Sequence, residues 1–457
     1  MVLSFNEFLK RKFPDIFDDD PDIFDDMKTK AIRIIQVLKS HNHQAVFAGG
    51  FVRDMIMNLD SHDIDIATDA TPDQVESYFK NTIPVGKKFG IVKVLIDGTE
   101  FEVATFRNDG IYLDGRHPAE IVFTDARSDA LRRDFTINGM FYDPISDKII
   151  DYVGGQEDLT EGIIRFIGDP EERIAEDKLR ILRAIRFAVR FGFQLEKQTF
   201  KAIQSHASEI AQVSMERIQQ ELVKMLEIGK PRQMIELLYE SRILHYILPE
   251  IEDLKDVPQD PKWHPEGDVL EHTIRVMEGL VGKSIELQLA GLFHDVGKPM
   301  STIISEDKIS TPEHAKVGAD ITREILERLK FPSKTINYVS KLVCDHMKIT
   351  SVLEMRKSRQ KMFFAQENYE DLRALHIADK MGGSGDLSHL REIDELKAKY
   401  ELESLRPVPF VTGRDLIQLG FTSGRVLGDL KTEIYERQLE GEFKDKSEAI
   451  EFAKMRL

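Results

Sequence analysis

The chain has 457 residues, a formal net charge of −17, and 41% hydrophobic and 31% charged residues, which is typical of a soluble globular protein. It has no apolar run near the roughly 18 residues that cross a bilayer, and its start lacks the apolar core of a secretory signal, so we expect no membrane association. The single cysteine, Cys344, excludes an internal disulfide framework and predicts a cytoplasmic location. The acidic total argues against nucleic-acid binding over the whole surface.

The hydrophobic period changes along the chain. Residues 1–26 carry eight acids and three bases, and we expect a solvated acidic arm. A helix is predicted over 27–42. The strands and helices that are predicted after it alternate: strands at 45–50, 64–68, 90–96, 101–107, 119–123 and 148–153, a hairpin turn at Asp97-Gly98, and helices at 50–59, 72–80 and 128–140.

The predicted fold class is therefore α+β. Residues 27–160 form a head with a mixed β-sheet, and helical patterns dominate from there to the end of the chain. Proline-containing breaks near 245–265 and 405–410 favour three further segments, at 161–255, 256–385 and 386–457.

The first candidate site lies early in the head. Gly49 and Gly50 open a predicted helix that carries Arg53, and this predicts a cradle for phosphate. Asp63 and Asp65 stand two residues apart on an apolar run, so a strand would project both carboxylates from one face. Two such carboxylates can hold divalent metals for phosphoryl transfer. A turn before a helix and a solvated acidic edge are the alternative interpretation.

Three further groups of the head extend this hypothesis. Glu102 lies between Phe101 and Val103, and we expect it on the face that carries the two aspartates, where three carboxylates suit Mg²⁺. A cross-strand ion pair is the alternative for Glu102. Arg133 suits phosphate and Asp134 a ribose hydroxyl, although a salt-bridged helix start explains both equally well.

A basic helix follows the head. Seven bases and one acid lie between Lys178 and Ser205, and the apolar residues recur at helical spacing, so an RNA backbone could dock on the basic face unless it is merely solvated. Asp177 and Arg180 stand at i and i+3. They form either an intrahelical salt bridge, worth about 0.2–0.5 kcal/mol, or a protein template that accepts cytosine and adenine and repels uracil and guanine.

The ordered motifs GGFVRD, DIDIAT, FEVATFR, RRDFTIN, DYVGGQEDL and EDKLRILRAIRF resemble the class II tRNA nucleotidyltransferase and bacterial poly(A) polymerase family over about residues 30–250. The resemblance implies a nucleotidyltransferase head, then a helical neck, body and tail. It implies that Gly50 and Arg53 contact the triphosphate and that Asp63 and Asp65 bind Mg²⁺. It also implies that the nucleotide pocket is lined by Arg133, Asp177, Arg180, Arg183 and Arg186. The mildly basic VGKKFGIV segment is more similar to enzymes that act on tRNA.

A second constellation lies in residues 256–385. The run LFHDVGKP resembles HD-domain phosphohydrolases, in which histidines and aspartates bind one or two divalent metals. Imidazole with carboxylate suits transition metals, whereas a single buried histidine is more often part of a core. The residues that are predicted to form this second metal site are His272, His294, Asp295, His314, His346 and Asp379.

These observations predict an enzyme that adds C and A nucleotides to the 3′ end of tRNA from CTP and ATP, with Asp63, Asp65 and Glu102 as catalytic carboxylates, Mg²⁺ as cofactor, and no obligate protein partner. Addition of CC or A alone and poly(A) synthesis use the same motifs and stay open. A phosphohydrolase acting through the HD residues is a hypothesis from another class. The tail, residues 386–457, resembles the helical tail of these enzymes and is expected to grip the outer part of tRNA by shape.

Overall fold

The computed structural model describes residues 22–61, 63–84, 86–109, 121–262, 264–305 and 309–457. Residues 1–21 of the predicted acidic arm lie outside this part. The chain divides into two compact units, Met1–Ile228 with Glu236–Ile247, and Gly229–Ile235 with Leu248–Leu457. Each unit is described by itself. The finer boundaries at 160, 255 and 385 stay predictions.

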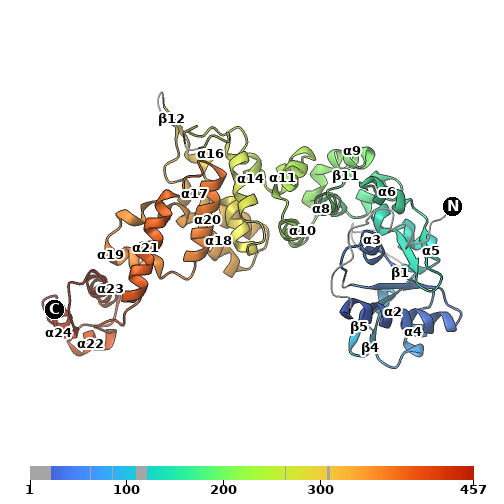
Figure 1. The fold of residues 1–457 in the computed structure, drawn as a ribbon, viewed down its shortest axis with the longest axis horizontal. Helices are drawn as coiled ribbons and strands as arrows, with labels where there is room; N and C mark the ends of the chain where they lie inside the picture. The colour runs from blue at the N-terminus through green and yellow to red at the C-terminus, as the bar shows by residue number, and fades with distance from the viewer. Residues whose placement is uncertain (1–21, 62, 85, 110–120, 263, 306–308) are drawn as a thin grey trace. The chain divides into compact units, whose positions relative to one another are not determined.

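The first unit contains a seven-stranded mixed sheet (Figure 1) with the strand order β3-β4-β5-β2-β1-β8-β9. Its strands β2 and β5 pair in parallel, and the other neighbours pair antiparallel. The bounds are β1 Ala45–Ala48, β2 Asp65–Thr68, β3 Thr82–Ile83, β4 Ile91–Ile96, β5 Thr99–Thr105, β8 Met140–Asp143 and β9 Lys148–Asp151, with a separate hairpin of β6 Arg107–Asp109 and β7 Ile121–Phe123.

One helix explains how the sheet acquires its core. In α2 (Asp22–Ser40), the residues Ala31, Ile34, Ile35 and Leu38 are fully buried, which is the spacing of one helix face. The helix packs on β1, β2 and α4 (Pro72–Tyr78). In chain order α3 (Gly50–Ile56) follows β1 and precedes β2, and it packs on β1 and β8. The expected α+β class with a mixed-sheet head is confirmed.

The prediction of a helix over residues 128–140 is wrong beyond Leu131, where α5 ends. The chain forms α5 (Ala126–Leu131), a 3₁₀ turn η2 (Thr136–Asn138) and then β8. Phe135 makes an isolated bridge with Phe166, and their rings stack 5.1 Å apart. Residues Met140–Asp143 form β8, which pairs with β1 on one side and β9 on the other. Pairing within the sheet therefore outweighs the local helix propensity of this segment.

The DYVGGQEDL motif has the structural role expected of a turn. The Asp151 carboxylate accepts hydrogen bonds from the backbone N–H groups of Val153, Gly154, Gly155 and Gln156 and so begins α6 (Gly155–Glu161). A Cβ on Gly155 would lie 2.3 Å from the Thr136 carbonyl oxygen, so only glycine permits this approach to η2.

Helices form the remainder of the first unit, as expected, with one short parallel strand pair that the sequence did not predict. The bounds are β10 Ile163–Ile164, α7 Pro170–Glu176, α8 Arg180–Phe191, β11 Gln194–Leu195, α9 Lys197–Ser205, η3 Ala207–Gln212, α10 Met215–Ile228, α11 Pro231–Glu240, which passes from one unit to the other, and α12 Ile243–Ile247.

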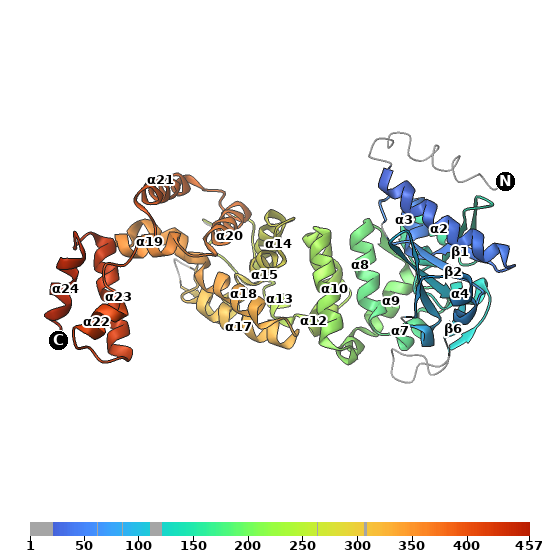
Figure 2. The ribbon, with the colours of Figure 1, turned by 90° about the horizontal axis from the view of Figure 1, so that it is seen from below.

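In its described residues, the second unit is helical apart from one short hairpin. Its strongest helix packing joins α17 to α18 and α14 to α20, and the members of each pair lie side by side in Figure 2. None of the described helices is both long and apolar enough to cross a bilayer. The bounds are α13 Pro249–Glu252, α14 Val269–Gly279, α15 Ile285–Phe293, α16 Lys298–Ser301, β12 Ile303–Ile304, β13 Ile309–Ser310, α17 His314–Arg328, α18 Ser333–Asp345, η4 His346–Glu354, α19 Lys357–Phe364, α20 Tyr369–Gly382, α21 Ser388–Glu403, α22 Gly413–Gln418, α23 Arg425–Glu440 and α24 Lys446–Lys454.

Candidate active site

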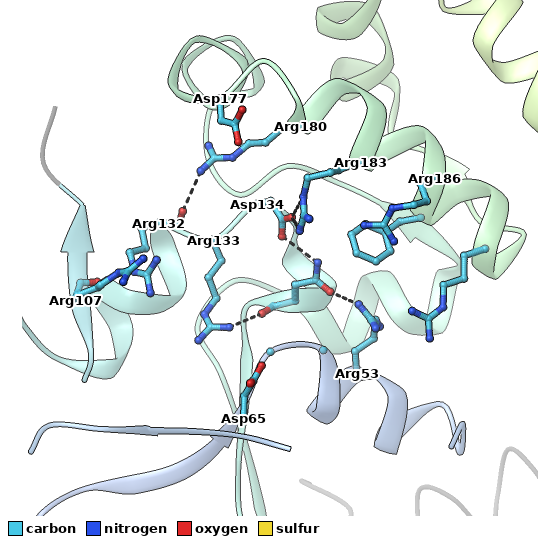
Figure 3. Close-up of a pocket in the computed structure, with 15 residues that line it drawn as sticks. Arg53, Asp65, Arg107, Arg132, Arg133, Asp134, Asp177, Arg180, Arg183 and Arg186 are labelled. Atoms are coloured by element: carbon cyan, nitrogen blue, oxygen red, sulfur yellow. Dashed lines mark hydrogen bonds and ion pairs between the residues drawn. The ribbon is translucent and has the colours of Figure 1, made fainter. Parts of the chain in front are cut away.

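A polar cleft of about 480 Å³ lies in the first unit, between the sheet and α8. Figure 3 shows the side chains of α8 projecting toward Arg53 and Asp65 on the opposite wall. Arginine dominates the lining, which suits a polyanion. The lining residues are Gly49, Gly50, Arg53, Asp65, Arg107, Arg132, Arg133, Asp134, Asn138, Asp177, Arg180, Arg183, Arg186, Phe187 and Arg190.

Gly49 shapes the floor of this cleft at the end of β1. Its φ is 66°, a conformation that L side chains rarely adopt. A Cβ there would lie 2.7 Å from Arg133 Nη1 and 3.9 Å from Asp65 Oδ2. The predicted glycine pair therefore brings backbone next to both charged groups.

The predicted carboxylates lie at the edge of the cleft. Asp65 begins β2 and is half-buried, whereas Asp63 precedes the strand and is exposed, so only one of the two lies on the strand itself. Asp65 stands in register with Glu102 on the parallel neighbour β5. Burial and the negative charge of Asp63 raise the pKa of Asp65 to about 6, against the opposing effect of Arg133.

These groups fit a divalent cation by their chemistry. They offer only oxygen ligands. The negative charges of Asp63 and Glu102 repel that of Asp65, and a bound cation would offset this repulsion. For Glu102 the alternative of a cross-strand partner stays open, because Lys93 stands opposite it on the antiparallel neighbour β4, although the Lys93 ammonium makes its ion pair with Glu100 at 3.0 Å. Within the described residues, the three carboxylates do not form a set whose ligand atoms all lie within 4.8 Å of one another.

Asp134 organises the middle of the cleft. It accepts hydrogen bonds from Arg183 Nε at 2.9 Å and from Asn138 Nδ2 at 2.9 Å. Burial would raise the pKa of Asp134, but Arg183 and Asn138 outweigh it and lower the value to about 2. Asn138 in turn accepts from Arg53 Nη1 at 2.5 Å, so the charges are linked across the cleft. The alternative of a local salt-bridged helix start describes Arg133, which pairs with Asp129 of α5, whereas Asp134 lies outside any helix and pairs with the distant Arg183.

The proposed template residues do not pair with each other. Asp177 directly follows α7 and is held by both terminal nitrogens of Arg217, at 3.1 and 2.8 Å. Arg180 begins α8 and contacts Glu176 at 2.5 Å. The intrahelical salt bridge that the spacing allowed is therefore absent, and the predicted continuous helix breaks between the two residues.

The basic helix α8 buries two of its four arginines, whereas Arg190 at its end is exposed. Arg180 and Arg186 are only 7% and 8% exposed, and Arg186 contacts Glu221 of α10 at 2.5 Å. Burial removes these two residues from any surface on which an RNA backbone could dock. The amphipathic pattern identified the helix, but it did not indicate that the charged face borders a cleft.

Several residues of the cleft escaped the sequence interpretation. Arg107, Arg132, Asn138, Phe187 and Arg190 line it, and all lie within or next to the quoted motifs. Asp129, Arg217 and Glu221 support it from outside. Buried Asp129 contacts both Arg132, at 2.7 Å, and Arg133, at 2.9 Å. Their charges are unremarkable in sequence, and only the fold shows what they hold.

All six predicted HD residues come together in the second unit. His272 Nε2 lies 3.0 Å from Asp379, and His294 Nε2 lies 3.1 Å from Asp295. The ligand atoms of His272, His294 and Asp379, and those of Asp295, His314 and His346, lie within 4.8 Å of one another in each group. Imidazole with carboxylate is a donor set for transition metals.

The sequence missed one carboxylate beside these residues. The Glu266 side chain is fully buried, and its Oε1 lies 2.6 Å from His272 Nδ1. The Glu266 carboxylate thus faces Nδ1, while Nε2 of the same ring faces Asp379 and Asp295, which is the arrangement of many metal-binding histidines.

Comparison with known proteins agrees with this geometry. Family models match at residues 45–165 (poly A polymerase head domain), 192–255 (probable RNA and SrmB-binding site of polymerase A) and 269–382 (HD domain). Fold and site thus define a nucleotidyltransferase with an HD domain, and both domains indicate use of a divalent metal.

The relatives identify the family. The CCA-adding enzyme of Enterococcus faecalis is 31% identical over 436 residues, which cover 93% of this chain and 95% of that protein. The chain belongs to the family of CCA-adding enzymes. Other curated relatives match over about half of their length, for example that of Bacillus pumilus, at 45% identity over 57% of that protein. The structure of the Bacillus stearothermophilus CCA-adding enzyme in complex with CTP is similar with a TM-score of 0.71 and 27% identity, covering 94% of this chain and 97% of that chain.

Proposed function

We propose that this protein adds C and A nucleotides to the 3′ end of tRNA from CTP and ATP without a nucleic-acid template, and releases pyrophosphate. The observation that carries the proposal is the single cleft in which Asp65 faces Asp177 and Arg180 across a set of arginines. The reacting end of a nucleotide and its base can thus be held at the same time. The cytoplasm is the proposed location, without an obligate protein partner.

The base is selected by Asp177 and Arg180. A carboxylate accepts from the exocyclic amine of cytosine or adenine, and a guanidinium donates to the neighbouring ring nitrogen. Uracil and guanine present a carbonyl and a ring N–H at these places, so both contacts become unfavourable. Arg217 and Glu176 orient the two side chains.

The triphosphate is held by the arginines, which bind phosphate oxygens bidentately. Arg53 and Arg133 approach the floor at Gly49 and Gly50, while Arg183 lies on the wall of α8. Asp63, Asp65 and Glu102 would hold Mg²⁺ at the edge. When bound, this ion supplies the positive charge that activates an attacking hydroxyl and stabilises the departing pyrophosphate.

The experiment that tests the proposal uses tRNA that lacks its CCA end. The purified protein receives CTP, ATP or both, and the product ends are sequenced. We expect CCA ends with both nucleotides and CC ends with CTP alone. Addition that stops after CC, addition of A only to tRNA ending in CC, or long A tracts on a generic oligonucleotide would support the narrower or broader polymerases and contradict CCA addition.

A second candidate function resides in the HD cluster. The convergence of His272, His294, Asp295, His314, His346 and Asp379 supports binding of a transition metal such as manganese and a phosphohydrolase activity. Release of phosphate or opening of a cyclic phosphate, lost in His294→Ala and Asp295→Ala, is the expected result. A rate that is the same in these variants would contradict it.

A further inference from the structure

A buried lysine lies inside the HD cluster. Lys298 begins α16, three residues after Asp295, and only 6% of its surface is exposed. Its Nζ lies 2.6 Å from Asp295 Oδ2 and donates a hydrogen bond to Gln259 Oε1, also at 2.6 Å. A buried ammonium is costly unless it is paired, and the contact with Asp295 offsets the cost of burying Lys298.

This ion pair occupies an oxygen that faces the metal-ligating imidazoles. Asp295 Oδ2 lies 3.1 Å from His294 Nε2 and 3.7 Å from His272 Nε2, while its Oδ1 lies 3.5 Å from His314 Nε2. A cation held by Asp295, His272 and His294 would therefore meet the ammonium at the same carboxylate oxygen. Two cations repel there, so the lysine and the metal compete for Asp295.

Gln259 supplies a second donor next to the lysine. It is 7% exposed, its oxygen accepts from Lys298, and its Nε2 has no hydrogen-bond partner in the part of the chain that the structure describes. A buried donor without an acceptor costs free energy. Once the ammonium leaves Asp295, Lys298 and Gln259 together present a positive charge and an N–H donor. Both are groups that bind phosphate oxygens.

We propose that Lys298 and Gln259 form the phosphate-binding part of the HD site, and that Lys298 takes this role when a divalent metal displaces it from Asp295. The proposal rests on the second candidate function and names the group that its substrate presents, a terminal or cyclic phosphate. It predicts opposite effects of one substitution. Removal of the ammonium strengthens metal binding and weakens phosphate binding, whereas a merely structural lysine would affect both in the same direction.

The test compares the full-length protein with its Lys298→Met variant by calorimetric titration, first with Mn²⁺ alone and then with inorganic phosphate on the metal-loaded protein. Mn²⁺ or phosphate binding that remains in the His294→Ala variant is attributed to the head and is subtracted from every titration. We expect about tenfold tighter Mn²⁺ binding and about tenfold weaker phosphate binding, since one nearby unit charge is removed. The matched control is Lys397→Met, because Lys397 also pairs with carboxylates, Glu401 at 2.7 Å and Glu370 at 3.3 Å. It should change neither titration.

A second variant keeps the test decisive if Lys298→Met does not fold. Gln259→Leu should weaken phosphate binding and leave Mn²⁺ binding within about twofold of the wild type, because it removes a neutral amide and no charge. If the wild type binds Mn²⁺ through His294 but both variants bind phosphate normally, or if Lys298→Met weakens metal and phosphate together, the inference is wrong. If the wild type shows no His294-dependent Mn²⁺ binding, the HD metal site itself fails, and this inference fails with it.

Discussion

Single residues decide how charge is distributed in the cleft. Asp65 sits where burial and neighbouring carboxylates disfavour its ionised form, and Asp134 sits where Arg183 and Asn138 favour it. The two aspartates therefore suit different tasks. Asp134 is already satisfied by protein groups and positions them, whereas Asp65 still needs positive charge.

We expect Asp65→Ala to lower nucleotide addition by at least about a thousandfold, because the proposed metal loses its half-buried ligand. Binding of CTP without metal should change little, since the arginines remain. Single-turnover incorporation into tRNA measures the first effect, and equilibrium dialysis of CTP the second. Incorporation at the wild-type rate would remove Asp65 from the mechanism.

Arg217 offers a test of base selection by a residue outside the cleft. It holds both oxygens of Asp177, so Arg217→Met should let that carboxylate rotate and lower the ratio of kcat/KM for CTP over UTP by about tenfold. The ratio in Asp177→Ala gives the limit of the effect. Arg217→Lys keeps the charge and loses the bidentate geometry, and we expect an intermediate ratio. Equal ratios in all four proteins would contradict the template.

At the scale of elements, short contacts fix how helices follow the sheet. The turn at Asp151 begins α6, and α6 then packs on η2. A hydrogen bond from Thr136 to Asp158 at 2.6 Å and an ion pair between Arg165 and Asp158 at 3.0 Å tie the same elements together. Asn138 is the last residue of η2 and Asp134 lies two residues before its start, and both line the cleft, so the geometry of η2 reaches the cleft.

Gly155→Ala should destabilise the first unit by about 1–3 kcal/mol, because the new methyl group would press against the Thr136 carbonyl. Urea unfolding followed by circular dichroism measures the loss. The matched control is Gly428→Ala in α23, where a Cβ meets nothing within 4 Å and alanine favours the helix. Equal stabilities of the two variants would contradict the prediction, because they would show that η2 moves enough to accommodate the methyl group.

The contact between α7 and η3 should depend on pH. A hydrogen bond with Glu209, opposed by burial and aided by Glu171, raises the pKa of His206 above its ordinary value of 6.5. Its contribution to stability is therefore complete below about pH 6.5 and is lost as the pH rises through the raised value. We expect the difference in Tm between the wild type and His206→Gln to shrink between pH 6 and pH 9, at roughly constant ionic strength. A difference that grows with pH would contradict the assignment.

At the scale of the whole molecule, the two candidate sites belong to different compact units. Every residue of the cleft lies in the first unit, and every residue of the HD cluster lies in the second. No side chain is shared, so substitutions in one site should not alter the chemistry of the other.

We therefore expect Asp295→Ala to leave nucleotide addition to tRNA within about twofold of the wild type, while it abolishes Mn²⁺ binding by the HD site. Asp65→Ala should do the reverse. Incorporation assays and metal titrations on the same preparations check both. A fall of about tenfold or more in addition by Asp295→Ala would show coupling between the units.

Local patterns in the sequence were enough to predict the mixed-sheet head, the helical remainder and most of the residues that line the cleft and the HD cluster. Glycine pairs, alternating strands and arginine-rich helix faces are local patterns, and the ordered motifs carry the chemistry. Long-range contacts were needed to show where α5 ends and that Asp177 and Arg180 do not pair. They also bring Asp129, Arg217, Glu221, Glu266 and Lys298 into contact with residues of the two candidate sites. Burial and ion pairing across distant segments determine what a charged residue does, and no local pattern records its neighbours in space.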